Sequence, residues 1–320
     1  MRKLSYPQPR QPKIIIILGH TASGKSDLAV ELAEKFNGEI ISADSRQLYK
    51  GMDIGTGKIT KKEMRGIPHH LLDVVSSKTK FDVARYQKLA HKKIADILKR
   101  GKLPIVCGGT GLYIKAIVEN PRYPDVPPDW KLRKKLEKLS AEKLFSMLKK
   151  LDRARTKTID SKNPRRLIRA IEIAKQINNP RTERAEQSPH DGRVPPKKDY
   201  PKYDALLIGI KKSPDELKKA IATRLHKRMR QGMANEVKKL HKQGISWERL
   251  EELGLEYKYV ALYLQNKIDK KTVLETLETK INQYAKRQMT WFKKTPDINW
   301  IRNKKEVIAL IQSALHPHTR

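Results

Sequence analysis

The clearest chemical motif in this chain is a glycine-rich segment close to its N-terminus. It consists of Gly19, His20, Thr21, Ala22, Ser23, Gly24, Lys25 and Ser26, in the pattern G-x-x-x-x-G-K-[ST]. Glycines in such a loop let backbone N–H groups turn inward around phosphate oxygens, while Lys25 adds a positive charge and Ser26 offers a hydroxyl to Mg²⁺. The motif therefore predicts a di- or triphosphate ligand with Mg²⁺, and it leaves the identity of that ligand open.

A carboxylate follows the second apolar run of the chain. Asp44 comes directly after Ile40-Ile41-Ser42-Ala43, where a strand is expected to end. Ligands of open α/β sheets bind at that edge, so Asp44 is suited to act as a general base or to hold Mg²⁺ through water. Capping of a following helix is an equally good interpretation, because Asp and Ser both cap well.

Two further polar segments carry candidate site residues. Thr110, within Gly108-Gly109-Thr110-Gly111, is suited to present its hydroxyl to a ligand or to cap a helix. His69 and His70 are adjacent, so an extended segment points them to opposite sides, which disfavours a shared metal. No cysteine or clear third ligand accompanies them, and structural hydrogen bonding is the better interpretation.

Short apolar runs alternate along the chain with segments of helical spacing. These strands and helices must position the candidate site residues. Strands are predicted over residues 14–18, 40–41, 103–107, 205–210 and 298–301, and helices over 24–36, 82–100, 214–230, 233–243, 257–264 and 270–294. The run from Ile14 to Leu18 is apolar at every position, which is typical of a parallel strand buried on both faces. The alternation therefore predicts an α/β fold around a parallel sheet.

The character of the sequence changes after about residue 120. Prolines interrupt the pattern, and two or three basic helical stretches then run to about residue 177. Residues 130–169 contain 15 Lys and Arg against 4 Asp and Glu, a local charge of +11. Residues 178–201 carry five prolines without periodicity and are predicted to form a surface loop. We therefore predict a core domain over 1–120 and 201–320 with a helical insertion over 121–200.

The overall charge indicates the kind of partner. The chain carries 70 Lys and Arg against 35 Asp and Glu, a net charge of +35. This excess predicts a polyanion, nucleic acid before membrane, although a lysine-rich proteome would give the same balance. The single cysteine, Cys107, excludes a disulfide framework and a cysteine zinc site within one chain. Without an apolar leader or a stretch of about 18 apolar residues, we expect a cytoplasmic protein with no membrane partner.

An ordered set of motifs accompanies the phosphate loop. The set comprises Asp44-Ser45-Arg46-Gln47, Gly51-Met52-Asp53-Ile54-Gly55-Thr56, Gly66-Ile67-Pro68-His69-His70-Leu71, Gly108-Gly109-Thr110-Gly111-Leu112-Tyr113, Asn163-Pro164-Arg165-Arg166-Leu167-Ile168-Arg169-Ala170 and Tyr284-Ala285-Lys286-Arg287-Gln288-Met289-Thr290-Trp291-Phe292. From about Ile14 to Trp300 the chain resembles the tRNA dimethylallyltransferase (tRNA isopentenyltransferase) family in its bacterial form. Phosphate loops occur in many families, whereas this ordered set is specific.

The resemblance implies a P-loop kinase-like α/β core with an inserted all-helical domain that binds the tRNA anticodon stem. It also implies transfer of a dimethylallyl group from dimethylallyl diphosphate to N6 of the adenine immediately 3′ of the anticodon. Mg²⁺ is the implied cofactor, and ATP is not consumed. We expect the enzyme to act as a monomer.

The resemblance also assigns roles to individual residues. The phosphate loop, Lys25 and Arg224 are expected to hold the diphosphate, with Mg²⁺ near Ser26. Asp44 is expected to accept the proton of the adenine amine, and Thr110 to orient that amine. The residues expected to contact tRNA are Asp44, Ser45, Arg46, Gln47, Thr110, Arg133, Arg165, Arg166, Leu167, Ile168 and Arg169. A solvated helix face is the alternative for the last arginines, and helix packing is an equally good interpretation of residues 284–292.

The chain departs from the usual family pattern at three places. His20 stands in place of a proline, Gly57 in place of an alanine, and Glu256 before Tyr257 in place of a glycine. None of these changes removes an expected catalytic group. The alternatives are a P-loop kinase that uses ATP, an adenylate prenyltransferase that acts on a free nucleotide, and a non-catalytic RNA-binding protein. The first two leave the basic insertion unexplained, and the third leaves Lys25 and Asp44 unexplained.

Overall fold

The contacts between residues divide the chain into two compact units. The computed structural model describes residues 12–177, 200–301 and 304–315. One unit comprises Met1–Asn120 with Tyr200–Arg320, and the other comprises Pro121–Asp199. Each unit has a hydrophobic core of its own. The predicted surface loop over 178–201 lies outside the described residues, except at its last two positions.

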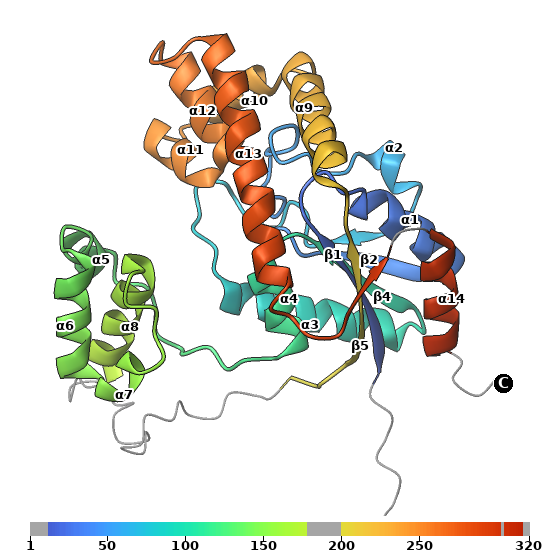
Figure 1. Cartoon of the computed structure of the whole chain (residues 1–320), viewed down its shortest axis with the longest axis horizontal. Helices are drawn as coiled ribbons and strands as arrows, with labels where there is room; N and C mark the ends of the chain where they lie inside the picture. Colours follow the sequence, from blue (N-terminus) through green and yellow to red (C-terminus); the bar gives the residue numbers. More distant parts are fainter. Residues whose placement is uncertain (1–11, 178–199, 302–303, 316–320) are drawn as a thin grey trace, which may run out of the picture. The chain divides into compact units, whose positions relative to one another are not determined.

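A six-stranded sheet in the order β3-β2-β4-β1-β5-β6 forms the centre of the first unit (Figure 1). The strands are β1 (Lys13–Gly19), β2 (Gly38–Ser42), β3 (His69–His70), β4 (Leu103–Gly108), β5 (Asp204–Ile210) and β6 (Ile298–Ile301). Every neighbouring pair is parallel. The predicted α/β fold and its five strands are confirmed. The sequence did not predict β3, because two residues are too few to show a period.

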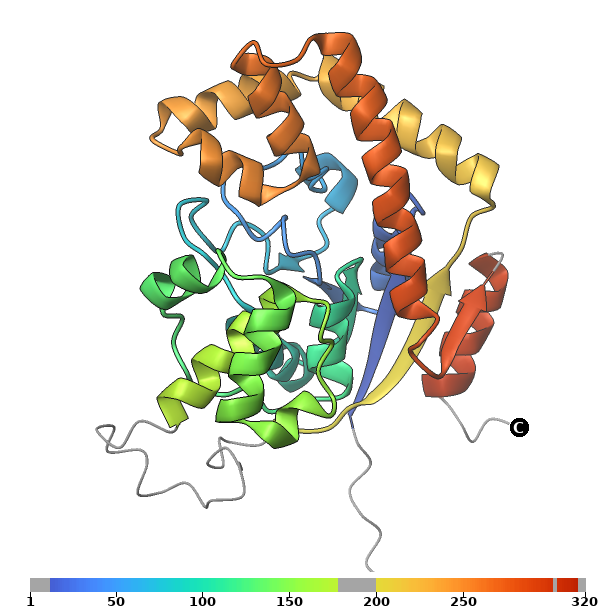
Figure 2. The same ribbon diagram turned by 60° about the vertical axis from the view of Figure 1, so that its left-hand side comes forward.

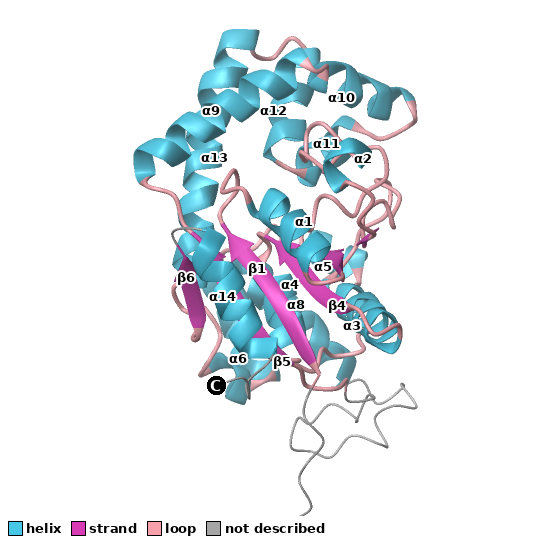
Figure 3. Cartoon of the chain, turned by 90° about the vertical axis from the view of Figure 1, so that its right-hand side faces the viewer, coloured by secondary structure: helices cyan, strands magenta, loops and turns pink. Residues whose placement is uncertain are grey.

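Strand β1 lies in the middle of the sheet and is buried on both faces. Ile14, Ile16 and Leu18 pack against α3 (Val83–Lys99) and α4 (Gly111–Val118). Ile15 and Ile17 point to the other face, where α1 (Lys25–Lys35) and α14 (Lys304–Leu315) cover the sheet (Figure 3). Since successive side chains of a strand alternate between faces, the unbroken apolar run supplies two core layers at once.

A group of helices follows the sheet strand β5. It consists of α9 (Pro214–Arg230), α10 (Met233–Lys242), α11 (Trp247–Leu253), α12 (Leu255–Leu264) and α13 (Lys270–Phe292). These helices share a hydrophobic core that includes Leu225, Val237 and Tyr257. Helix α13 extends beyond that core, because Ile281 lies within it whereas Phe292 packs into the core of the sheet. The two parts of this unit are thus joined by one long helix (Figure 1).

Four helices of the first unit were not predicted: α2 (Lys61–Met64), α4, α11 and α14. The sequence of α4, Gly-Leu-Tyr-Ile-Lys-Ala-Ile-Val, is apolar at almost every position and has no helical period. Helix α2 has only four residues, and a capping box at Thr60 and Glu63 begins it. Among the described residues, no helix is long and apolar enough to cross a membrane.

The described part of the second unit is entirely helical (Figure 2). It contains α5 (Trp130–Leu136), α6 (Ala141–Leu151), α7 (Arg153–Thr156) and α8 (Pro164–Ile177). Leu144, Leu148, Leu167 and Ile171 are fully buried in its core. The basic residues of this segment therefore lie on a small helical unit with an apolar interior.

Candidate active site

The phosphate loop connects β1 to α1 in the geometry that its glycines allow. Gly24 begins the helix with a φ of 92°, in the left-handed region that favours glycine. A side chain at Gly19 would place its Cβ 2.5 Å from the carbonyl oxygen of Ile210, so only glycine fits there. The loop thus lies at the N-terminus of α1, where free N–H groups and the helix dipole favour an anion.

Two desolvated cations lie at this loop. Lys25 donates from Nζ to the carbonyl oxygen of His20 at 2.6 Å, and Arg224 on α9 donates from Nη2 to that of Gly57 at 3.1 Å. The pKa of Lys25 is lowered to about 8, mainly by burial and in smaller part by the positive charge of Arg224. Burial likewise lowers the pKa of Arg224 to about 10. Among the described residues neither cation has an ion-pair partner, so the site is suited to receive an anion.

Asp44 lies at the carboxyl end of β2, near both cations. Its negative charge raises the pKa of Lys25 and of Arg224, and so offsets part of the larger lowering by burial. Its Oδ1 accepts from the backbone N–H groups of Arg46 at 2.8 Å and of Gln47 at 3.4 Å. The side chain therefore caps the turn that follows β2. Both contacts use the same carboxylate oxygen, Oδ1. Asp44 itself is half-buried at the edge of the sheet.

Thr110 joins the ends of β2 and β4. Its Oγ1 accepts from the N–H of Ser45 at 3.0 Å, and its own N–H donates to the carbonyl oxygen of Ala43 at 3.1 Å. Thr110 begins α4, yet its side chain makes no capping hydrogen bond to that helix. Because the hydroxyl accepts from Ser45, its hydrogen points elsewhere and can be donated to a ligand beside Asp44.

Arg46 and Gln47, two of the three predicted neighbours of Asp44, differ in their surroundings. Arg46 is exposed, whereas Gln47 is half-buried and donates from Nε2 to the carbonyl oxygen of Gly57 at 3.4 Å. That same oxygen accepts from Arg224. The Asp44 turn, the Gly57 loop and α9 therefore meet at one point.

A half-buried carboxylate fixes the loop before Gly57, and sequence reasoning missed it. Glu236 on α10 accepts the backbone N–H groups of Asp53, Ile54 and Gly55 at 2.9, 2.7 and 3.0 Å. Its Oε1 also accepts from the hydroxyl of Tyr257 at 2.7 Å. Three of these hydrogen bonds hold the loop whose Gly57 accepts from Arg224, and the fourth holds the carboxylate itself. No local spacing pattern connects residues that lie about 180 positions apart.

Two of the three departures from the family pattern lie beside this loop. Gly57 has a φ of 59°, and a Cβ there would lie 1.6 Å from Nη2 of Arg228 and 2.2 Å from Nη2 of Arg224. Glu256 pairs with Arg228 at 3.2 Å. The negative charge of Glu256 also raises the pKa of Arg224 in part, against the larger lowering by burial. The glycine and the glutamate thus accommodate the same pair of arginines.

The third departure, His20, is buried inside the phosphate loop. Its Nδ1 hydrogen-bonds to the carbonyl oxygen of Thr21 at 2.9 Å, and its Nε2 lies 3.3 Å from the N–H of Lys212. Since the backbone N–H can only donate, Nε2 accepts and Nδ1 carries the hydrogen. Burial lowers the pKa of His20, which keeps the ring neutral. His20 therefore anchors the loop to the segment after β5.

Metal-binding groups are few in the described residues. His69 hydrogen-bonds to the carbonyl oxygen of Ile67 at 2.8 Å and His70 to Glu39 at 2.7 Å, which confirms that both are structural. No cluster of three or more His, Cys, Asp or Glu side chains is placed to hold a metal in the described ranges. Ser26 is exposed at the start of α1. A single hydroxyl at a phosphate loop fits Mg²⁺ that arrives with a diphosphate, because Mg²⁺ takes the rest of its ligands from phosphate and water.

The arginines expected to contact tRNA differ in their surroundings within the second unit. Arg165 and Arg166 are exposed at the start of α8. Arg133 donates from Nε and Nη2 to Glu172 at 2.8 and 2.6 Å, and Arg169 also pairs with that carboxylate. Glu172 is 2% exposed, so it fixes both guanidinium groups.

Leu167 and Ile168 lie in the core of the same unit, at 0% and 5% exposure. Their side chains therefore pack inside the unit and position the arginines around them. On α13, Lys286 and Arg287 are exposed while Ala285 and Gln288 are buried, so that segment combines packing with a basic surface.

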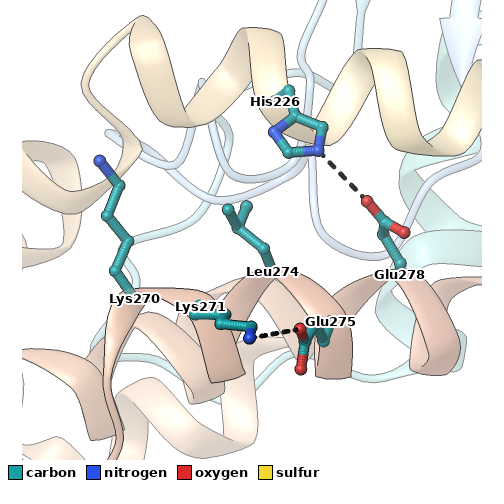
Figure 4. Close-up of a pocket in the computed structure, with 6 residues that line it drawn as sticks. All are labelled: His226, Lys270, Lys271, Leu274, Glu275 and Glu278. Carbon is teal, nitrogen blue, oxygen red and sulfur yellow. Dashed lines mark ion pairs between the residues drawn. The ribbon is translucent and has the colours of Figure 1, made fainter.

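A hollow of about 550 Å³ lies between α9 and α13 (Figure 4). Its lining consists of His226, Lys270, Lys271, Leu274, Glu275 and Glu278. His226 pairs with Glu278 at 3.3 Å, and Lys271 with Glu275 at 4.0 Å. Two ion pairs therefore lie within the lining, and none of the predicted site residues is part of it.

The parallel sheet, the phosphate loop and the two neighbouring cations, Lys25 and Arg224, define a P-loop α/β protein with a helical insertion. Residues 47–295 match the model of the IPP transferase family. The tRNA dimethylallyltransferase of Acetivibrio thermocellus is 42% identical over 297 residues, which cover 92% of each chain. The chain belongs to the IPP transferase family.

Solved structures show the same similarity. The tRNA isopentenylpyrophosphate transferase of Bacillus halodurans superposes with a TM-score of 0.68 at 34% identity and covers 96% of both chains. A eukaryotic dimethylallyltransferase, solved while acting on tRNA, superposes with a TM-score of 0.78 at 27% identity. The latter match covers 96% of this chain and 80% of the other.

Proposed function

We infer that this chain transfers a dimethylallyl group from dimethylallyl diphosphate to N6 of the adenine immediately 3′ of the anticodon in tRNA. Membership of the IPP transferase family supports this reaction. The observation that carries it in the structure is two cations, Lys25 and Arg224, which lie at the phosphate loop beside Asp44 and form no ion pair with any described residue. Two cations next to a carboxylate suit a reaction in which an anion leaves while a proton is taken up.

The donor half of the reaction needs stabilisation of the leaving diphosphate. When the bond between C1 and oxygen breaks, its electron pair goes to the diphosphate. Lys25, Arg224 and the N–H groups at the start of α1 are already in place at the loop, so they would stabilise that charge with little reorganisation. When bound near Ser26 with the diphosphate, Mg²⁺ would supply further neutralisation of that charge.

The acceptor half needs a nucleophile and a proton acceptor. The exocyclic amine of adenine is weakly nucleophilic, because its lone pair is delocalised into the ring. We propose that Asp44 accepts the amine proton while the Thr110 hydroxyl orients the amine. Both groups occupy adjacent loops at one edge of the sheet, joined by the Ser45–Thr110 hydrogen bond. Reaching this edge requires the adenine to be flipped out of the anticodon loop.

We propose that the second unit binds the anticodon stem and that Arg165 and Arg166 contact its phosphates. Both side chains are exposed on a strongly basic segment. Arg133 and Arg169 would act in the orientation that Glu172 gives them, while Leu167 and Ile168 would support the helix from its core. Ser45, Arg46 and Gln47 would contact the nucleotides beside the flipped adenine. Because every catalytic group comes from one chain, we propose that the enzyme acts as a monomer, in the cytoplasm with its tRNA.

Transfer of label from dimethylallyl diphosphate to an RNA stem-loop tests this function directly. The substrate is an anticodon stem-loop with adenines at its last anticodon position and at the next position. A loop with guanine in place of the second adenine and free AMP are the controls. We expect label in the first RNA alone. Label in AMP would identify a free-nucleotide prenyltransferase, and hydrolysis of ATP without label transfer would identify a kinase-like activity.

A further inference from the structure

Gln288 is a buried polar residue for which the proposed mechanism has no use. It lies in α13, one turn before the end of the helix, and is 7% exposed. Its side chain contacts Thr21 of the phosphate loop and Gly109, which lie 267 and 179 positions away in the sequence. A buried amide with two such distant partners connects parts of the fold that the chain itself does not connect.

Each end of the Gln288 amide has a complementary partner. Its Oε1 accepts from the backbone N–H of Thr21 at 2.9 Å, and its Nε2 donates to the carbonyl oxygen of Gly109 at 2.8 Å. The reverse orientation would place the amide nitrogen against an N–H and the amide oxygen against a carbonyl. The contacts therefore fix the side chain in one orientation.

These two partners belong to opposite halves of the proposed reaction. Thr21 lies in the phosphate loop, which holds the donor. Gly109 directly precedes Thr110, whose hydroxyl holds the turn that carries Asp44. Gln288 thus joins the donor loop to the acceptor loop through one rigid amide.

The surrounding packing prevents this bridge from adjusting its length. A Cβ on Gly109 would lie 2.4 Å from Nε2 of Gln288, so the loop approaches the amide as closely as a glycine allows. A Cβ on Gly111 would lie 2.3 Å from Cε3 of Trp291, one turn further along α13. Ala285 and Phe292, on the same side of the helix, are fully buried. The helix is therefore packed closely against the loop that carries Thr110.

We propose that Gln288 is a positioning residue that sets the separation between the donor's C1 and the acceptor amine. The inference rests on the proposed function. Gln288 touches neither substrate, and it acts by fixing the phosphate loop relative to Thr110 and Asp44. Since a displacement of about 1 Å can reduce a rate about 10²-fold, such a bridge controls turnover more than it controls binding.

A displaced amine changes the product of the reaction as well as its rate. In transfer, the bond between C1 and oxygen breaks with its electrons going to diphosphate, a bond between C1 and N6 forms, and Asp44 takes the amine proton. If water stands in place of the amine, a bond between C1 and the water oxygen forms instead, and the water loses one proton. The products are then dimethylallyl alcohol and diphosphate, so the ratio of alcohol to prenylated RNA reports the alignment.

The test uses Gln288→Met, which has the same length and lacks both hydrogen bonds. Gln87→Met is the matched control, because Gln87 is also buried in this unit and donates to Ala116 and Asn120, both at 3.0 Å. We expect Gln288→Met to bind inorganic diphosphate and the RNA stem-loop within about threefold of the unaltered chain. We expect its turnover to fall about 10- to 100-fold and its ratio of alcohol to prenylated RNA to rise. Gln87→Met should lose thermal stability and keep the original ratio.

An unchanged ratio in Gln288→Met, or an equal change in Gln87→Met, would overturn this inference and leave the proposed function intact. A loss of binding that accounts for the whole fall in turnover would overturn it as well. If the unaltered chain forms no prenylated RNA, the proposed function fails and this inference fails with it. If circular dichroism shows that Gln288→Met is unfolded, the same measurements on Gln288→Glu decide the question, because that variant keeps the acceptor for Thr21 and places an oxygen in place of the donor to Gly109.

Discussion

Arg224 and Gly57 are joined by a hydrogen bond of 3.1 Å although they lie 167 positions apart in the sequence. The guanidinium comes within reach because Gly57 has no side chain and adopts a φ of 59°. We expect Gly57→Ala to displace Arg224 and to weaken binding of inorganic diphosphate about tenfold, equivalent to about 1.4 kcal/mol. Isothermal titration measures this directly.

Gly244→Ala is the matched control for that substitution. Gly244 also has a positive φ, of 86°, but a Cβ there meets nothing closer than Nζ of Lys78 at 3.4 Å. We expect this control to cost stability through backbone strain and to leave diphosphate binding unchanged. Equal binding losses in the two variants would show that strain, and not the position of Arg224, is responsible.

Asp44→Asn removes the proton acceptor and keeps a side-chain oxygen that can cap the turn after β2. We expect tRNA binding to remain and turnover to fall by about 10²- to 10⁴-fold, which is the usual contribution of a general base. Single-turnover kinetics with bound tRNA separates the two effects. A fall of less than about tenfold would exclude Asp44 as the base.

The carboxylate of Glu236 is expected to support Arg224 through the loop that it holds. In Glu236→Gln, the amide can accept with one atom only, so backbone N–H groups among those of residues 53–55 lose their acceptor. We expect stability to fall by about 1–3 kcal/mol and diphosphate binding to weaken. Tyr257→Phe removes one of the four hydrogen bonds and should reduce stability without changing diphosphate binding. Unchanged binding in Glu236→Gln would show that the loop keeps its shape without it.

The pKa of Lys25 makes diphosphate binding sensitive to pH. Burial lowers this pKa from the usual 10.5 to about 8, so the free protein loses the charge as the pH rises through that value. We expect the Kd for inorganic diphosphate, relative to that of Lys25→Arg, to rise about tenfold per pH unit above about pH 8, because arginine stays protonated. Dividing one Kd by the other cancels the effect of diphosphate ionisation, because that effect is the same for both proteins. A constant ratio from about pH 7 to about pH 9.5 would contradict the shift.

The same shift affects the stability of the free protein. Between about pH 8 and 10.5 the unfolded chain binds more protons at Lys25 than the folded chain does. Stability therefore rises with pH through this window, in the direction opposite to that of ligand binding. Denaturant titrations of the unliganded protein at several pH values measure this trend.

The exposed arginines of α8 are expected to determine how strongly RNA binding depends on salt. We expect Arg165→Ala with Arg166→Ala to weaken binding of the stem-loop and to reduce the slope of log K against log salt by about 1–2. Lys149→Ala with Lys150→Ala is the matched control, because these exposed lysines of α6 remove the same charge from the same unit. An equal effect of both double variants would indicate general attraction and no defined contact.

Sequence alone predicted the parts of this site whose residues are neighbours in the chain. The phosphate loop is such a part, because each of its roles depends on backbone geometry over eight neighbouring positions. The period-free run at Ile14 to Leu18 likewise predicted a central strand. Helix α4 escaped prediction because its apolar sequence has no period, and tertiary packing against β1 decides its conformation.

Other parts depend on contacts that no local pattern encodes. Glu236 and Gln288 act on backbone groups far away in the sequence, and a buried side chain that bonds a backbone amide carries no signature of its partner. Leu167 and Ile168 are different, because the helical spacing of α8 already marks them as apolar core positions. Reading that spacing separates them from the exposed Arg165 and Arg166 on the same helix.

Helix α13 belongs to the cores of both the helical group and the sheet, through Ile281 and Phe292. Fluctuations that loosen either core therefore displace the same helix. Through the contact between Gln288 and Thr21, that displacement reaches the phosphate loop. Partial opening of the helical group would release the loop while the sheet is still folded. Catalytic competence should thus disappear on heating before the sheet melts, and amide exchange along α13 should report that loss earlier than any change in the strands.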